Sequence, residues 1–151
     1  MAFDIKSTLE TLEDWLKKSG YFPKAAIGEP KQPPQEETSA AVFMNRVSTI
    51  RVFANGGLSE VHLVTVRVYR NMLAEPQQDI ELDLARLISS DSSDLVGDFT
   101  MGGAVMALDV AGMHGTPYGA TWGYLDVGGK MYRIVDILAP FIVNDSATAA
   151  P

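Results

Sequence analysis

The chain has 151 residues, 46% of them hydrophobic and 21% charged, so it is long enough for one domain with a buried core. It contains no cysteine, which excludes disulfides, thiolate nucleophiles and cysteine-based zinc sites. The net charge is −7, and residues 71–151 alone carry three basic and eleven acidic side chains, which disfavours tight binding to nucleic acid phosphates.

The first residues, MAFDIKSTLE, lack the basic region and apolar run of a secretory signal. The longest wholly apolar stretch, residues 137–143, is far shorter than a membrane span. We therefore expect a soluble protein that is not exported and has no membrane partner.

A first helix is predicted from residue 5 to residue 19. Ile5, Leu12 and Leu16 recur at helical spacing after Asp4, a good N-cap residue. Gly20 suits the left-handed conformation that follows many helices, so the helix is expected to end there.

The stretch IGEPKQPPQEETSA, residues 27–40, holds three of the eight prolines. Each proline removes a backbone donor and biases the preceding residue to extended geometry, so residues 28–40 are predicted to form an extended loop. Two interpretations remain open. The loop is either a plain surface connection or a projecting arm, extended in advance so that a neighbouring subunit captures it at little cost in entropy.

Residues 41–54 and 60–70 are rich in Val, Ile, Thr and Phe, and NGGLS between them favours a hairpin. Strict alternation predicts a core face and a polar face. The core face would carry Ile50, Val52, Val64, Val66 and Val68, and the polar face Thr49, Arg51, Thr65 and Arg67.

A second helix is predicted to begin near Pro76 and to end near Ser89, with Ile80, Leu84 and Ile88 on one side. The next residues, SSDSSDLVGDF, indicate a break with a short capped turn. Ser and Asp favour such turns because their side chains bond to nearby backbone groups.

Further strands are predicted at residues 104–111, 120–127 and 130–138, and a final extended piece at 141–144. The fold class is therefore α+β. We expect one mostly antiparallel or mixed β-sheet with two helices packed on one face, in a single domain of residues 1–145, and a flexible tail at 146–151.

Candidate catalytic residues are few. His62 shares the parity of the core valines and is interpreted as a histidine at the end of the sheet. His114 lies in GMHGTPYG, residues 112–119, with Asp109 upstream; we favour a contact residue at a loop tip, with an acid–base role as the alternative. The loop lacks the Lys-Ser/Thr of a phosphate-binding loop, and no G-x-S-x-G motif occurs. No catalytic residue or cofactor is predicted.

Asp91, Asp94 and Asp98 form the densest carboxylate cluster. Their spacing does not fit an EF-hand loop, so helix capping is the preferred interpretation, and calcium binding the alternative. No metal site is predicted.

Charged and aromatic side chains in the strands suggest an interface. Arg51, Arg67, Trp122, Tyr124 and Arg133 are expected on the sheet face away from the helices. Such a face is either solvated or covered by another subunit, and aromatic residues with arginine favour the second.

The order of these features resembles the tail terminator proteins of long-tailed bacteriophages, particularly those with non-contractile tails. The features are the N-terminal helix, the GEPKQPP loop, VTVRVYRNML, the helix after EP, and GYLDVGGKMYRIVDILAPFIVND. The resemblance covers about residues 4–145.

The resemblance implies a non-enzymatic subunit of the virion tail or neck, assembled in the host cytoplasm. It would form a homo-hexameric ring that caps the tail tube, ends polymerisation and joins the head-completion proteins, while DNA passes through without specific binding. We expect subunit or partner contacts at Arg51, Arg67, Trp122, Tyr124 and Arg133, at Glu29, Lys31, Pro33 and Pro34, and at His114 and Tyr118.

Two alternatives remain. The chain could be another head-to-tail connector, such as a head-closure or adaptor protein. It could also be a small enzyme or ligand-binding domain that uses the His114 loop.

Overall fold

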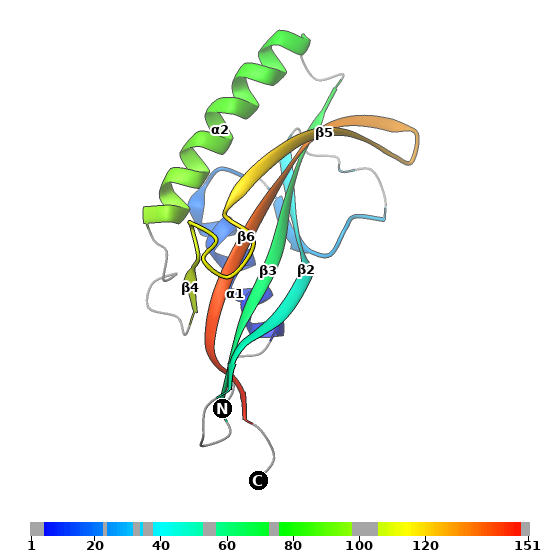
Figure 1. Ribbon diagram of the computed structural model, residues 1–151. Helices are drawn as coiled ribbons and strands as arrows, with labels where there is room; N and C mark the ends of the chain where they lie inside the picture. Colours follow the sequence, from blue (N-terminus) through cyan, green and yellow to red (C-terminus); the bar gives the residue numbers. More distant parts are fainter. Residues whose placement is uncertain are drawn as a thin grey trace.

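The structure is a computed structural model that describes residues 5–22, 24–31, 34, 38–52, 57–72, 76–97 and 106–148. These residues form two helices and six strands (Figure 1). The elements in chain order are α1 (Ile5–Ser19), β1 (Lys24–Ile27), β2 (Thr38–Val52), β3 (Gly57–Asn71), α2 (Gln77–Gly97), β4 (Met106–Leu108), β5 (Gly119–Val127) and β6 (Lys130–Thr148). Within the described residues, no helix is long and apolar enough to cross a membrane.

α1 forms where the sequence predicts the first helix. Its buried residues, Thr8, Leu12 and Leu16, recur at every fourth position, so one stripe of the helix faces the core. Full burial of a leucine side chain contributes about 1.5–3 kcal/mol, more than an exposed ion pair between neighbouring turns contributes. The helix ends before Gly20, whose φ of +82° strains any residue with a side chain.

The sheet is mixed, with the order β1-β2-β3-β6-β4. β1 runs parallel to β2, and the other pairs are antiparallel. β6 pairs with β3 along one edge; along its other edge it pairs first with β5 and then with β4. The separate strands predicted at 130–138 and 141–144 are therefore one continuous strand, which extends to Thr148, into the segment expected to be a loose tail.

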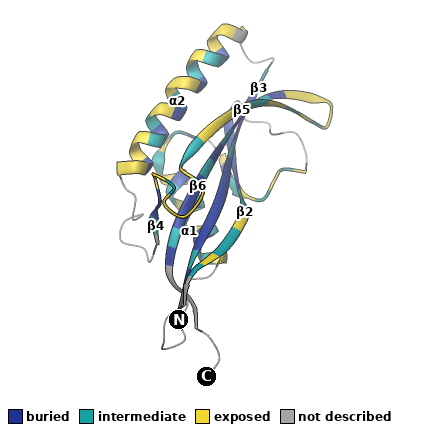
Figure 2. Ribbon diagram, viewed as in Figure 1, coloured by how far each residue is buried: buried dark blue, intermediate teal, exposed yellow. Residues whose placement is uncertain are grey.

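One face of the sheet, here called the helix face, carries the main core. Val64, Val66 and Val68 of β3 lie on it and are almost fully buried, as the dark blue strands in Figure 2 show. The same apolar cluster includes Leu12 and Leu16 of α1, Ile80, Leu84 and Ile88 of α2, and Val135, Ile137, Ala139 and Phe141 of β6. The predicted α+β fold, with helices packed on one face of a mixed sheet, is confirmed.

The opposite face, here called the open face, is less polar than predicted. Ala41, Tyr69, Tyr132 and Ile134 form a second buried cluster there. The rings of Tyr69 and Tyr132 meet edge to face, with centroids 6.0 Å apart. Alternation indicated a polar face because Thr65 and Arg67 lie on it, but the side chains of this buried cluster share that face.

Two register shifts in β2, between Met44 and Arg46 and between Thr49 and Arg51, change which of its residues share a face. A β-bulge adds one residue to one strand and so reverses the alternation beyond it. Thr49 consequently pairs with Glu60, whose parity is that of the helix face. The prediction that Thr49 lies on the polar face was therefore wrong.

α2 continues to Gly97, although a break was predicted after Ser89. Tertiary contacts outweigh the turn preference of the serines and aspartates in this segment. Leu95 is 1% exposed and belongs to the main core, and the Tyr118 hydroxyl donates to Ser92 Oγ at 2.8 Å. These contacts hold the last turns of α2 in helical form.

Candidate interaction surfaces

Trp122 and Tyr124 of β5 lie on the helix face, so their predicted position on the opposite face was wrong. β5 pairs with β6 such that Trp122 is opposite Val135 and Tyr124 is opposite Arg133. Val135 is fully buried in the helix-face core, so Trp122, Tyr124 and Arg133 also lie on the helix face. Both aromatic residues remain accessible, at 38% and 52% exposure. Trp122, Tyr124 and Arg133 are called the β5–β6 patch below.

Arg133 is held by contacts within its own subunit. Its Nε and Nη2 donate to the two carboxylate oxygens of Glu81 on α2, and its Nη1 donates to the Gly123 carbonyl at 3.1 Å. The guanidinium carbon lies 4.3 Å from the centroid of the Tyr124 ring. Arg133 therefore ties α2 to the β5–β6 hairpin and positions Tyr124. Glu81 was missed because no sequence motif links it to Arg133.

Arg67 lies on the open face, so the predicted interface residues are divided between two faces. Its Nε and Nη2 donate to the two carboxylate oxygens of Asp136 at 2.7 and 3.0 Å. This hydrogen bonding, with the charge of Asp136, raises the pKa of Arg67. Its Nη1 lies 3.5 Å from Glu29 Oε1, and its guanidinium lies 5.3 Å from the ring centroid of Phe43.

The proline-rich loop contacts the open face at two described points. Glu29 pairs with Arg67, and the Tyr132 hydroxyl donates to the Pro34 carbonyl at 2.8 Å. At these points the loop lies against the sheet, which favours the interpretation as a surface connection over that as a projecting arm. Lys31 is exposed, whereas Pro33 lies outside the described residues.

Residues 109–118, here called the glycine-rich loop, have a defined shape. The buried Asp109 carboxylate accepts hydrogen bonds from the main-chain nitrogens of Met113 and His114, both at 3.1 Å. Gly112 has a φ of +71°, and a Cβ atom there would lie 2.5 Å from the backbone nitrogen of Pro117. Only glycine fits that position without movement of the backbone.

The glycine-rich loop presents its tip to solvent. Met113 is 84% exposed and His114 is also exposed. The base of the loop is anchored by Tyr118, which bonds to Ser92, and burial raises the pKa of Tyr118 to about 12. The Asp109 carboxylate accepts from the main-chain nitrogen of His114, whereas an acid–base pair would require a contact with the His114 imidazole. The contact between Asp109 and His114 is therefore structural and does not support the acid–base alternative.

The remaining predicted positions have different outcomes. His62 is fully buried on the helix face, and its Nδ1 lies 2.7 Å from Thr8 Oγ1, consistent with a structural role. The Arg51 side chain lies outside the described residues, as does Asp98. In the part of the chain that is described, no three acidic or histidine side chains converge as metal ligands.

Asp91 was predicted in a capping cluster, but it is a buried residue inside α2. It is 1% exposed, and among the described atoms its Oδ1 has no hydrogen-bond partner. Burial, together with the charge of Asp94, raises the pKa of Asp91 to about 7. Its spacing from Ile88 and Leu95, three residues before and four after, was the signal that it faces the core.

The chain matches no protein-family model and no curated protein. Among solved structures, it is similar to the PVC sheath/tube terminator of an extracellular contractile injection system in its extended state. The TM-score is 0.38 and the sequence identity is 10%. The alignment covers 100% of this chain, which spans 61% of the length of that terminator.

Proposed function

We propose that this protein is a structural subunit that forms a ring on the end of a tail tube. The ring ends tube polymerisation and presents a surface for head-completion proteins. The sequence resemblance to phage tail terminators supports this role. The described residues also support it, because they expose apolar side chains at two places on the surface.

The observation that carries the proposal is the presence of two separate exposed apolar surfaces. The β5–β6 patch exposes Trp122 and Tyr124 beside α2, and the glycine-rich loop exposes Met113. The glycine-rich loop is near the edge of the open face. Arg46, which is opposite Leu63 on that face, donates from Nη2 to Thr116 Oγ1 of the loop at 3.5 Å. A closed ring of head-to-tail contacts needs two different surfaces on each subunit. Exposed aromatic residues and methionine are typical of such contacts.

In the proposed assembly the ring is a hexamer located in the tail or neck of the virion. DNA passes through its hole without specific binding, and the excess of acidic residues in the second half of the chain fits that role because it repels phosphate. The proposed role involves no catalysis.

Loss of the protein distinguishes the proposed role from that of another connector. A terminator limits tube growth, so its absence should give abnormally long tubes. Absence of a head-closure or adaptor protein should instead leave tails of normal length that are not joined to heads. Tail length in a knockout, measured by negative-stain imaging, therefore tests the proposal.

Point variants test the two surfaces. Trp122→Ala with Tyr124→Ala should weaken ring formation, as should Met113→Ser, because each change removes exposed apolar contact area. Lys6→Gln is a matched surface control, since the Lys6 side chain is 82% exposed. If both surface variants assemble as well as this control, neither surface is used in the ring.

A further inference from the structure

One edge of β5 has no partner strand among the described residues. β5 pairs with β6 from Gly119 to Val127 without a register shift, and the two strands form the hairpin at one end of the sheet (Figure 1). β1 and β4, the end strands of the sheet order, span four and three residues, whereas β5 spans nine. β5 therefore offers a long row of backbone groups to a further strand.

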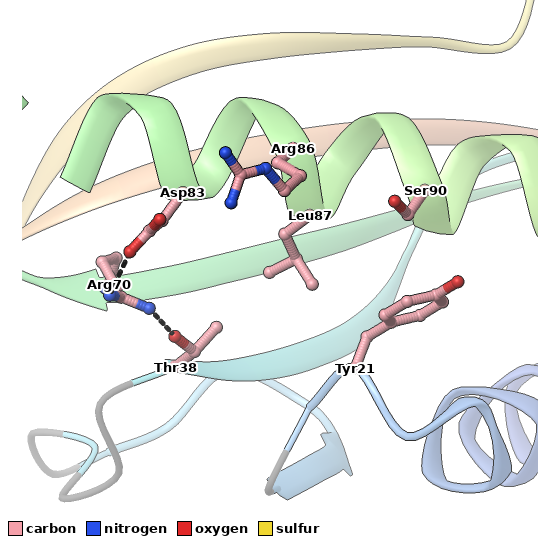
Figure 3. Close-up of a pocket in the computed structure, with 7 residues that line it drawn as sticks. All are labelled: Tyr21, Thr38, Arg70, Asp83, Arg86, Leu87 and Ser90. Atoms are coloured by element: carbon pink, nitrogen blue, oxygen red, sulfur yellow. Dashed lines mark hydrogen bonds and ion pairs between the residues drawn. The ribbon is translucent and has the colours of Figure 1, made fainter. Parts of the chain in front are cut away.

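α2 leaves this edge uncovered. Leu87 of α2 lines a pocket of about 310 Å³ with Thr38 of β2 and Arg70 of β3 (Figure 3). This side of the helix therefore faces the β2–β3 part of the sheet. On β5, residues of both faces are exposed, including Thr121 on the open face and Trp122 on the helix face. A helix packed over the edge would bury one of these sets.

The turn between β5 and β6 shows which backbone groups point outward. Gly128 and Gly129 have φ values of +58° and +86°, as in the type I′ turn of a two-residue hairpin. The residues that flank such a turn, Val127 and Lys130, bond to each other through their backbones, and bonded pairs alternate with non-bonded pairs along the two strands. Every second residue of β5 therefore points its N–H and C=O groups away from β6. These residues are Ala120, Trp122, Tyr124 and Asp126.

The β5 edge lacks the features that usually prevent strand pairing. Edge strands are commonly protected by proline, lysine or a β-bulge. The sequence of β5, GATWGYLDV, contains neither proline nor a basic residue, and its register with β6 is regular. Its one charged side chain, Asp126, accepts a hydrogen bond from the Gly129 main-chain nitrogen at 2.8 Å, which directs the carboxylate to the turn. The edge is therefore open to a second strand.

The β5 edge is complementary to itself. When two copies of β5 run antiparallel with their Gly123 residues opposite each other, every outward-pointing residue meets another one. Trp122 of one copy is then opposite Tyr124 of the second copy, and Ala120 is opposite Asp126. This register forms about eight backbone hydrogen bonds, two for each pair of residues. A shift by two residues in either direction loses one pair, so the central register is favoured.

The side chains favour the same register. Trp122 and Tyr124 are 38% and 52% exposed on the helix face, and the pairing brings the aromatic rings of both copies together. Cross-strand aromatic pairs stabilise antiparallel sheets. Asp126 meets an alanine, so no like charges are opposed.

We propose that the β5 edge binds the β5 edge of a second copy, which makes a symmetric dimer with one sheet running through both subunits. The contact is isologous, since the same residues contribute from each copy. This inference concerns the free chain and goes beyond the proposed ring. Trp122 and Tyr124 serve in both assemblies, so a subunit must leave the dimer before it joins a ring through the β5–β6 patch.

Analytical ultracentrifugation of the full chain measures the association, and we expect a monomer–dimer equilibrium. Ala120→Lys places a positive charge opposite Asp126 of the second copy and should lower the dissociation constant about fivefold. Ala120→Glu should raise it about fivefold, because each substitution acts at two symmetric cross-strand pairs. Ala120→Glu combined with Asp126→Lys should restore the dimer. Lys6→Gln, on exposed α1 surface, changes the net charge as Ala120→Glu does and should leave the dissociation constant unchanged.

Hydrogen exchange followed by NMR shows whether the backbone edge itself is paired. In the dimer, the amide hydrogens of Trp122 and Tyr124 should exchange at least severalfold more slowly than in the dilute monomer. Those of Thr121 and Gly123, which point to β6 in both states, should change little. Circular dichroism should show that the Ala120 variants remain folded; if Ala120→Glu does not, Ala120→Lys and the exchange rates decide.

Three results would overturn the proposal. One is a chain that stays monomeric at millimolar concentration. Another is an association that leaves the Trp122 and Tyr124 amides unprotected, or that responds alike to Ala120→Lys and Ala120→Glu. The third is a ring of more than two copies that forms without a dimer, which would rule out the symmetric pairing and leave the proposed ring standing.

Discussion

Arg133 Nη2 donates to Glu81 Oε2 at 3.3 Å, and Nε of the same guanidinium donates to Glu81 Oε1. This pair joins the middle of the sheet to the first half of α2. The Arg133 side chain is 14% exposed, so the pair is largely shielded from solvent. Among the described residues, this ion pair links α2 to the β5–β6 hairpin.

Glu81→Gln should lower the free energy of unfolding by about 1–2 kcal/mol, because it leaves a partly buried guanidinium without its charged partner. Glu10→Gln is the matched control. Glu10 pairs with Lys6 one turn away on exposed α1 surface, where such a pair contributes only about 0.3–0.5 kcal/mol. Urea denaturation of both variants measures the difference. Equal losses would show that the Arg133–Glu81 pair adds no more stability than an exposed ion pair.

The periodicity of apolar residues predicted some elements of this fold and left others hidden. α1 was predicted because Leu12 and Leu16 repeat on one side and Gly20 marks the end. Alternation along a strand places Trp122 and Tyr124 on the same side of β5. It could not show which set faces the helices, because that depends on the register with β6. The Arg133–Glu81 pair joins residues 52 apart and was therefore invisible in the sequence.

Asp91 should make stability depend on pH. Folding raises its pKa from 3.8 to about 7, so the native state binds the proton more tightly than the unfolded chain does. The contribution to stability is full below pH 3.8 and is lost as the pH rises through about 7. Asp91→Asn keeps a neutral side chain at every pH. It should be more stable than the natural protein at pH 8, by about 4 kcal/mol, with little difference near pH 4.

Chemical denaturation of both proteins at pH 4, 6 and 8 measures this difference. Asp14→Asn, an exposed change on α1, should not reproduce the pH dependence of the Asp91 variant. A difference between Asp91→Asn and the natural protein that stays constant across this range would contradict the raised pKa.

Asp109→Ala should loosen the glycine-rich loop. The variant loses the acceptor for the main-chain nitrogens of Met113 and His114, so their amide hydrogens should exchange at least severalfold faster. His114→Ala keeps both hydrogen bonds and serves as the control. Hydrogen exchange followed by NMR gives the rates. Unchanged rates in Asp109→Ala would show that the carboxylate does not hold the loop.

Tyr132→Phe should release the proline-rich loop from the open face. It removes the hydroxyl that donates to the Pro34 carbonyl while keeping the buried ring, so the expected cost is about 1 kcal/mol of stability. Tyr124→Phe is the control, because the Tyr124 ring is exposed. Denaturation curves compare the two variants. If they lose equally little stability, the Pro34 contact does not anchor the loop.

If this protein caps a tail tube, the purified chain should limit the growth of that tube. Tube protein from the same source would be polymerised with increasing amounts of the chain, and tube lengths measured by negative-stain imaging. We expect tubes to become shorter and uniform, with ring density at one end, and Trp122→Ala with Tyr124→Ala to reduce the effect. Tubes of unchanged length, with bare ends at saturating protein, would contradict it.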